Sequence, residues 1–121
     1  MNNYKELKVW KKSMELVKQI YMQTKSFPIE ERYGLTAQIQ RSAVSIPSNI
    51  AEGCGRNLEK ELIQFISIAH ASSYELETQI IIARELNLLS SEIFETINSI
   101  IQEVQKMLYA FKKTIISKQT V

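Results

Sequence analysis

The sequence of 121 residues has few of the residues that interrupt or cross-link a chain: three glycines, two prolines and one cysteine. Cys54 has no second cysteine to pair with, so an internal disulfide is excluded, and a cytoplasmic protein is the simplest expectation. The turn residues are too scarce for the many turns of a β-sheet of this length. The sequence therefore predicts a few long helices that form a single domain over residues 1–121.

Long apolar runs and clusters of metal ligands are also missing. No stretch approaches the roughly 20 apolar residues that cross a bilayer, so no membrane association is expected. His70 is the only histidine, and Ser67 stands where the Glu-x-x-His pairs of di-iron bundles would place a glutamate. No motif pairs Cys54 with a base, and no Gly-rich phosphate loop is present. The sequence thus predicts a protein that is not an enzyme, with no catalytic residue, metal or cofactor.

The residues that are present recur with the spacing of amphipathic helices. Four helices are predicted, over residues 4–25, from about 29–32 to 53, 57–87 and 91–116, and residues 117–121 are expected to fray. Short connections favour an all-α, antiparallel, up-down-up-down four-helix bundle. Pro47 lies within the second helix and crowds the carbonyl of Ala43, so a kinked second helix is expected. The hydroxyl of Ser42 or Ser45 could bond the freed carbonyl. Asn57 is the expected N-cap of the third helix.

Each predicted helix has one apolar stripe that is expected to face the core. These stripes are Leu7, Trp10, Met14, Val17, Tyr21 and Thr24; Leu35, Ile39, Ala43, Ile46 and Ile50; Leu62, Phe65, Ala69, Ser72, Ser73, Leu76, Ile80 and Ala83; and Ile93, Ile97, Ile100, Val104, Met107 or Leu108, Phe111 and Ile115. In the first helix, Val9, Ser13, Leu16 and Ile20 lie beside the stripe and broaden its apolar arc. The third helix is apolar beyond its stripe, which a monomer of this size cannot cover. We therefore predict an oligomer with an interface formed by Ile63, His70, Tyr74 and Ile81.

A polar stripe on the second helix invites three interpretations. It consists of Gln38, Arg41, Ser45, Ser48 and Glu52. Asn49, at the edge of the buried stripe, joins Gln38, Arg41, Ser45 and Glu52 in the candidate site, and Glu77 of the third helix is expected near it. One interpretation is a network of ion pairs and hydrogen bonds that joins two helices or two subunits. Another is a binding site for a polar ligand or a nucleic acid, and the third is a docking surface for a partner protein.

Positive charge is concentrated at the front of the chain, although the net charge is only +2. Residues 1–26 contain six lysines and two glutamates, whereas residues 58–89 contain two basic residues and five glutamates. Lysines on the outer side of the first helix suit either a solvated face or contacts with phosphates. The candidate nucleic-acid contacts are Lys5, Lys8, Lys12, Arg41 and Arg56.

Several motifs together resemble a known bacterial family. They are Leu7-Lys8-Val9-Trp10, Tyr33-Gly34-Leu35, the run Ser45-x-Pro47-x-Asn49-x-x-Glu52-Gly53, and Ser73-Tyr74-Glu75-Leu76-Glu77. This pattern, which covers nearly the whole chain, resembles the four-helix-bundle family named for proteins encoded in intervening sequences of 23S rRNA genes. It is also similar to accessory proteins of diversity-generating retroelements, which work with a reverse transcriptase and nucleic acid. The resemblance implies a ring-like homopentamer and transfers no catalytic residue.

Two functions follow as expectations. The first is a non-catalytic oligomeric scaffold that associates with RNA or DNA through basic surfaces. The alternative is a protein–protein interaction module that docks a partner, such as a polymerase, on the polar face of the second helix.

Overall fold

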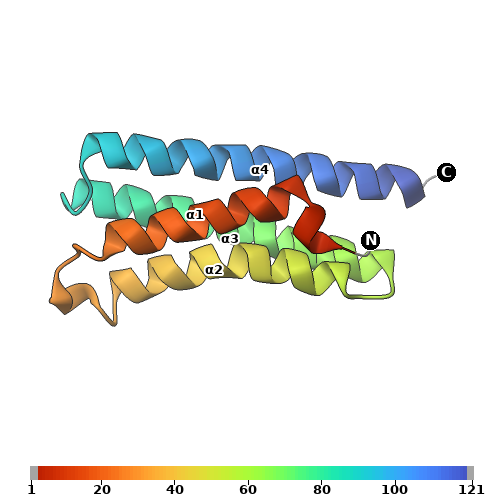
Figure 1. Ribbon diagram of the computed structural model, residues 1–121, viewed down its shortest axis with the longest axis horizontal. Helices are drawn as coiled ribbons and strands as arrows, with labels where there is room; N and C mark the ends of the chain where they lie inside the picture. The colour runs from red at the N-terminus through yellow and green to blue at the C-terminus, as the bar shows by residue number, and fades with distance from the viewer. Residues whose placement is uncertain (1–2, 120–121) are drawn as a thin grey trace.

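Four long helices make up the protein. The computed structural model describes residues 3–119, with Gln119 described by its backbone only, and this part of the chain contains no strand. The helices are α1 (Lys8–Thr24), α2 (Leu35–Cys54), α3 (Glu59–Glu85) and α4 (Ser91–Gln119). Consecutive helices run in opposite directions, and each packs against its two neighbours around the bundle (Figure 1). The predicted antiparallel four-helix bundle is confirmed.

Both chain ends and the α2–α3 connection lie at the same end of the bundle (Figure 1). The α1–α2 and α3–α4 connections lie at the opposite end. This arrangement brings together three segments that are far apart in the sequence, because an even number of antiparallel helices returns the chain to the end where it began.

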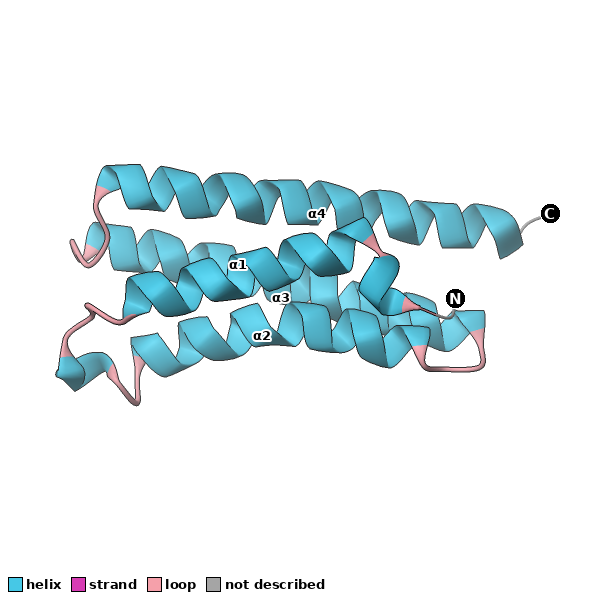
Figure 2. Ribbon diagram, in the orientation of Figure 1, coloured by secondary structure: helices cyan, strands magenta, loops and turns pink. Residues whose placement is uncertain are grey.

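Two short 3₁₀-helices explain why α1 and α2 start later than predicted (Figure 2). Residues 4–6 form η1 (Tyr4–Glu6), and the extended backbone of Leu7 separates it from α1. Residues 29–31 form η2 (Ile29–Glu31), and a turn ending at Gly34 separates it from α2. Tyr4 packs edge-to-face on Trp10 with ring centroids 5.4 Å apart, so η1 caps that end of the core.

The ends of α3 and α4 differ from the prediction in detail. Leu58, not Asn57, is the N-cap of α3, and it makes no side-chain cap bond. After α3, Asn87 adopts a left-handed conformation (φ 62°), which asparagine tolerates better than most residues. Ser90 Oγ accepts a hydrogen bond from the Ile93 N–H at 3.1 Å, as expected of a capping serine. The helix α4 continues past residue 116, where its end was predicted; residues 120 and 121 lie outside the described part.

The helix α2 is continuous across Pro47. The expectation that Ser42 or Ser45 bonds the carbonyl of Ala43 is wrong. The hydroxyl of Ser42 instead donates to the carbonyl of Ile39 and to α3, and the hydroxyl of Ser45 is paired with α3. The serines join two helices because their short side chains reach across a close contact. The kink itself stays a prediction.

The core is a column of branched aliphatic side chains from all four helices. The stripe predicted for α2 is buried apart from the half-buried Leu35. In α1 the buried line is shifted: Val9 and Leu16 are buried, whereas Trp10 is half-buried and Tyr21 is exposed. The helix α1 must face both α2 and α4, so the middle of its broad apolar arc points inward. The largest fully buried side chains are Leu16, Ile20, Ile39, Ile46, Ile50, Ile66, Leu76, Ile80, Ile97, Ile101, Val104 and Leu108.

Candidate functional site

The inner edge of the polar stripe forms a hydrogen-bonded seam between α2 and α3. Ser42 Oγ donates to Gln79 Oε1 at 2.6 Å, and both side chains are buried. The hydroxyls of Ser45 and Ser72 lie 2.9 Å apart. Asn49 Nδ2 donates to the carbonyl oxygen and to the hydroxyl of Ser45, at 2.8 and 2.9 Å. These side chains use their polar atoms within the bundle, so Ser45 and Asn49 contribute to the fold.

The seam is narrow at its end because Gly53 has no side chain. A Cβ atom at Gly53 would lie 2.8 Å from the Cβ of Phe65 and 3.3 Å from the carbonyl oxygen of Leu62. Carbon atoms do not approach so closely without a shift of the backbone, and glycine permits the contact. The more exposed Gly55 leaves only ordinary van der Waals distances of 3.5 and 3.7 Å to backbone oxygens.

The run from residue 45 to 53 therefore has a structural explanation for most of its residues. Serine and asparagine bond the seam, glycine permits close packing, and the remaining inward positions fill the core. Glu52 is exposed and bonds Arg56 one turn further on at 2.9 Å. The buried members are Ile46, Pro47, Ile50 and Gly53.

The outer edge of the polar stripe, formed by Gln38 and Arg41, makes no side-chain hydrogen bond to α3 within residues 3–119. Gln38 and Arg41 are exposed, and among residues 3–119 neither makes a side-chain hydrogen bond or an ion pair. No ion pair between described residues joins this stripe to α3 of the same chain. Glu77 instead accepts a hydrogen bond from Gln105 Nε2 of α4 at 3.1 Å. Glu77 thus bonds α4 and not the polar stripe of α2.

Two of the five candidate nucleic-acid contacts already have acidic partners. Lys12 Nζ lies 3.3 Å from Glu15 and 3.2 Å from Glu103 of α4, and hydrogen bonds to these carboxylates raise its pKa. Arg56 pairs with Glu52, and its guanidinium lies 4.9 Å from the ring centroid of Phe65.

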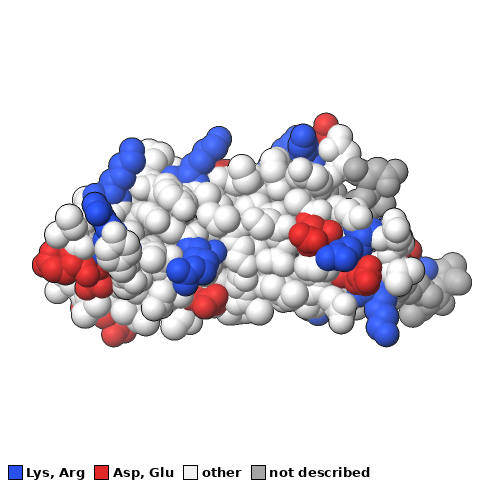
Figure 3. Space-filling model, turned by 90° about the horizontal axis from the view of Figure 1, so that it is seen from below, with Lys and Arg blue, Asp and Glu red and all other residues white. Residues whose placement is uncertain are grey.

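The other three candidates, Lys5, Lys8 and Arg41, are exposed and have no ion pair among the described residues. Lys5 and Lys8 lie where the chain begins, at the end of the bundle that also holds the α2–α3 connection. Arg41 lies in the N-terminal half of α2, which starts at the opposite end. In the view from the α2 side, blue side chains stand apart, separated by white and red surface (Figure 3). The candidates therefore do not form one continuous basic face on this side.

The predicted interface residues line the outer flank of α3. The rings of His70 and Tyr74 stack with centroids 5.2 Å apart, and with Tyr109 of α4 they border a shallow hollow of about 300 Å³. Tyr74 and Ile81 are 52% and 41% exposed. Partial burial, and then the charge of Lys112, lower the pKa of His70.

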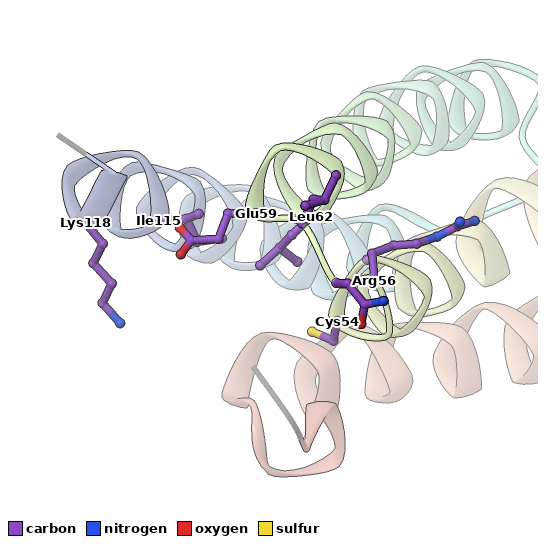
Figure 4. Close-up of a pocket in the computed structure, with 9 residues that line it drawn as sticks. Cys54, Arg56, Glu59, Leu62, Ile115 and Lys118 are labelled. Carbon is purple, nitrogen blue, oxygen red and sulfur yellow. The ribbon is translucent and has the colours of Figure 1, made fainter.

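A second hollow, of about 260 Å³, lies between the α2–α3 connection and the end of α4 (Figure 4). Cys54, Glu59 and Lys118 line it, with Arg56 at its side. Burial raises the pKa of the Cys54 thiol, so the thiolate is disfavoured and the side chain suits packing better than nucleophilic chemistry.

The described residues hold no group of three or more His, Cys, Asp or Glu side chains placed to bind a metal ion. None of the helices in this part of the chain has the length and apolar character needed to span a bilayer.

The family relationship follows from a match along most of the chain. The model of the 23S rRNA-intervening sequence protein family matches residues 5–110. The chain belongs to this family. No curated protein matches the sequence. A crystal structure of a protein of unknown function, from the S23 ribosomal protein family of Bacteroides thetaiotaomicron VPI-5482, is similar in fold. It shares 27% identity with a TM-score of 0.81, and the match covers 87% of this chain and 95% of that one.

In this member of the 23S rRNA-intervening sequence protein family, two buried residues of α3 were not predicted from the sequence. One contributes to the seam and the other to the core. Gln79 is buried and receives the hydrogen bond of Ser42, and Ile66 is fully buried. Both lie on the inward-facing side of α3. The available signal for Gln79 was that this polar residue has the spacing of the buried residues. Phe65, which was placed in the core, is only half-buried because it lies at the edge of the α2–α3 contact beneath Arg56.

Proposed function

We propose that this protein is a non-catalytic scaffold that assembles into a homo-oligomer and associates with nucleic acid in the cytoplasm. The single observation that carries the assembly is the exposure of large apolar side chains on both sides of the buried stripe of α3. The family description, which refers to intervening sequences of 23S rRNA, supports a nucleic-acid partner.

The two exposed flanks of α3 differ from one another. One flank, beside α4, holds Tyr74 and Ile81, and the other, beside α2, holds Ile68 and Ile82 at 47% and 42% exposure. Several large apolar side chains exposed on one helix suit contact with another molecule, because extensive apolar surface on a soluble protein often marks an interface. A closed ring requires two different patches on each subunit, and a helix with two apolar flanks can supply both. This arrangement supports the ring-like homopentamer that the family resemblance implies.

Solution mass measured by light scattering tests the assembly and the partner together. The mass of one chain is 14.0 kDa, and a particle of several times this mass is expected without nucleic acid. Addition of mixed RNA at low salt should raise the mass further, and salt should reverse the increase because phosphate contacts release counterions. A particle of 14.0 kDa at high micromolar concentration would contradict the assembly. A mass unchanged by RNA or DNA at low salt would contradict the nucleic-acid partner.

The alternative function is a docking module for a partner protein, such as a polymerase, on the outer edge of the α2 stripe. The exposed and unpaired side chains of Gln38 and Arg41 favour this alternative. Arg41→Ala and Glu52→Ala should then abolish binding of a purified polymerase candidate while the mass of the oligomer stays constant. Loss of the oligomer in these variants would show that the stripe is a subunit contact.

A further inference from the structure

Charge is divided unequally along the bundle. We call the end that holds the start of α1, the α2–α3 connection and the last turns of α4 the terminal end (Figure 1). The segments that reach it, residues 3–15, 52–61 and 103–118, contain ten of the fifteen Lys and Arg residues but six of the thirteen acidic residues. The rest of the chain holds five basic and seven acidic residues. A net charge of +2 therefore hides an excess of four positive charges at one end and two negative charges elsewhere.

Most cations of the terminal end have no acidic partner. The three ion pairs among residues 3–119 use only Lys12 and Arg56 as cations. Lys8, Lys113 and Lys118 are exposed and lie in none of these pairs. The C-terminal end of a helix attracts cations, which accounts for Lys118 in the last turn of α4. It does not account for the lysines at the start of α1, where the helix dipole is positive.

Lys118 borders two hollows at the terminal end, and each of them has another basic side chain in its lining. It lines the hollow beside Cys54 and Arg56 that is described above. It also lines a separate hollow on α4 together with Lys113 and Thr114. In Figure 4 the side chain of Lys118 extends from the end of α4 away from the helix, and that of Arg56, on the opposite side of the view, extends away from Lys118. Glu59 lines the hollow beside Cys54, so the surface is not a closed anion pocket. Dispersed, solvated lysines around a carboxylate suit a polyanion, which contacts many charges weakly, better than a single phosphate.

We infer that the terminal end of the bundle, through Lys8, Lys113 and Lys118, contacts the phosphodiester backbone of a nucleic acid. This inference rests on the proposed nucleic-acid association and gives it a location. It also changes the expected contacts, because it keeps Lys8 of α1 but replaces Arg41 of α2 by Lys113 and Lys118 of α4. In an oligomer each subunit repeats the terminal end, so weak contacts add up on one strand.

Two triple variants with equal change of charge test the location. K8Q/K113Q/K118Q removes three exposed lysines of the terminal end, and K18Q/K25Q/R32Q removes three exposed cations elsewhere. Fluorescence anisotropy with labelled mixed-sequence single-stranded RNA, and with DNA of the same sequence, gives the affinity over a series of salt concentrations. Circular dichroism and light scattering establish that both variants keep the helices and mass of the wild type.

The terminal-end variant should lose about tenfold or more in affinity near 0.1 M salt, and the slope of log K against log salt should decrease by about 2. The control variant should lose about threefold or less, because only the long-range field changes. Parallel measurements show whether the backbone belongs to RNA, DNA or either one.

Equal losses in both variants would overturn the location and leave the proposed function standing. Absence of wild-type binding to RNA and DNA at low salt would overturn both. Phosphatidylglycerol vesicles supply the other source of repeated phosphates. Binding to vesicles that the terminal-end variant abolishes, without binding to nucleic acid, would assign the surface to lipid and overturn the inference.

Discussion

The two sides of α3 differ in the kind of side chain that is buried. On the α2 side, polar side chains are buried: Ser72 and Gln79 are 8% and 7% exposed. On the outer α4 side, Tyr74 and Ile81 are left half in solvent although they are large and apolar. Polarity alone therefore does not decide which side of this helix faces inward.

The difference lies in size and in the supply of hydrogen-bond partners. Short serines let α2 and α3 approach closely, and Ser42 and Ser45 find partners across the contact in Gln79 and Ser72. On the outer flank, α4 supplies the long side chains of Gln105 and Lys106, which border the hollow without covering the rings. The seam is complete within one chain, whereas the outer flank is the kind of surface that a second molecule completes.

The largest effect is expected where the seam is tightest. Gly53→Ala places a methyl group 2.8 Å from the Cβ of Phe65, so the two helices must separate. We expect the free energy of unfolding to fall by about 1–3 kcal/mol in urea denaturation. Gly55→Ala is the matched control, because its Cβ meets no atom closer than 3.5 Å. Similar stability of the two variants would show that the seam tolerates a wider spacing.

A loss of equal or smaller size is expected from a single hydrogen bond of the seam. Ser42→Ala leaves Gln79 Oε1 buried without its donor, which should cost about 1–3 kcal/mol. Gln79→Leu in the same background removes the unpaired oxygen and should recover part of this loss. A double-mutant cycle from urea denaturation measures the coupling between the two positions. Additive effects would contradict the described contact.

Substitutions on the outer flank of α3 are expected to change the assembly much more than the free energy of unfolding of one chain. Tyr74→Glu and Ile81→Glu change the free energy of unfolding of a single chain by about 0.5 kcal/mol or less, since both side chains are already half-exposed. Light scattering should show a smaller particle, because each variant places a charge in the proposed interface. Tyr33→Glu is the control, since Tyr33 is 89% exposed near η2 and should leave the mass unchanged. An unaltered mass for the α3 variants would place the interface elsewhere.

The smallest effect concerns the pH dependence contributed by His70. Its pKa is lowered by partial burial and by Lys112, so the unfolded chain binds the proton first as the pH falls below about 6.5. Stability is therefore fully present above this pH and declines slightly toward acid. Urea denaturation between about pH 7.5 and 5.5, at fixed protein concentration, should show this decline in the wild type and a flatter profile in His70→Gln. A wild type that gains stability on acidification would reverse the assigned sign.

Particular residues show how far the sequence could be interpreted. The spacing of Ile39, Ile46 and Ile50 is sufficient to place them in the core, because a helix with one apolar stripe has only one way to bury it. The apolar arc of α1 is too broad for this argument. Leu16 is fully buried because α1 packs against both α2 and α4, and the spacing alone did not single it out. Gln79 could not be paired with Ser42 from spacing, since the partner lies 37 residues away.

The sequence by itself determined the number, order and direction of the helices, because scarce turn residues and a 3.6-residue period leave a short chain little alternative to a bundle. It also determined that α3 has more apolar surface than one chain buries. Only the tertiary structure decided which polar side chains serve the fold and which face solvent, and which lysines gather at one end. Those outcomes depend on the register and rotation of one helix against another, and these are set by contacts between residues far apart in the chain.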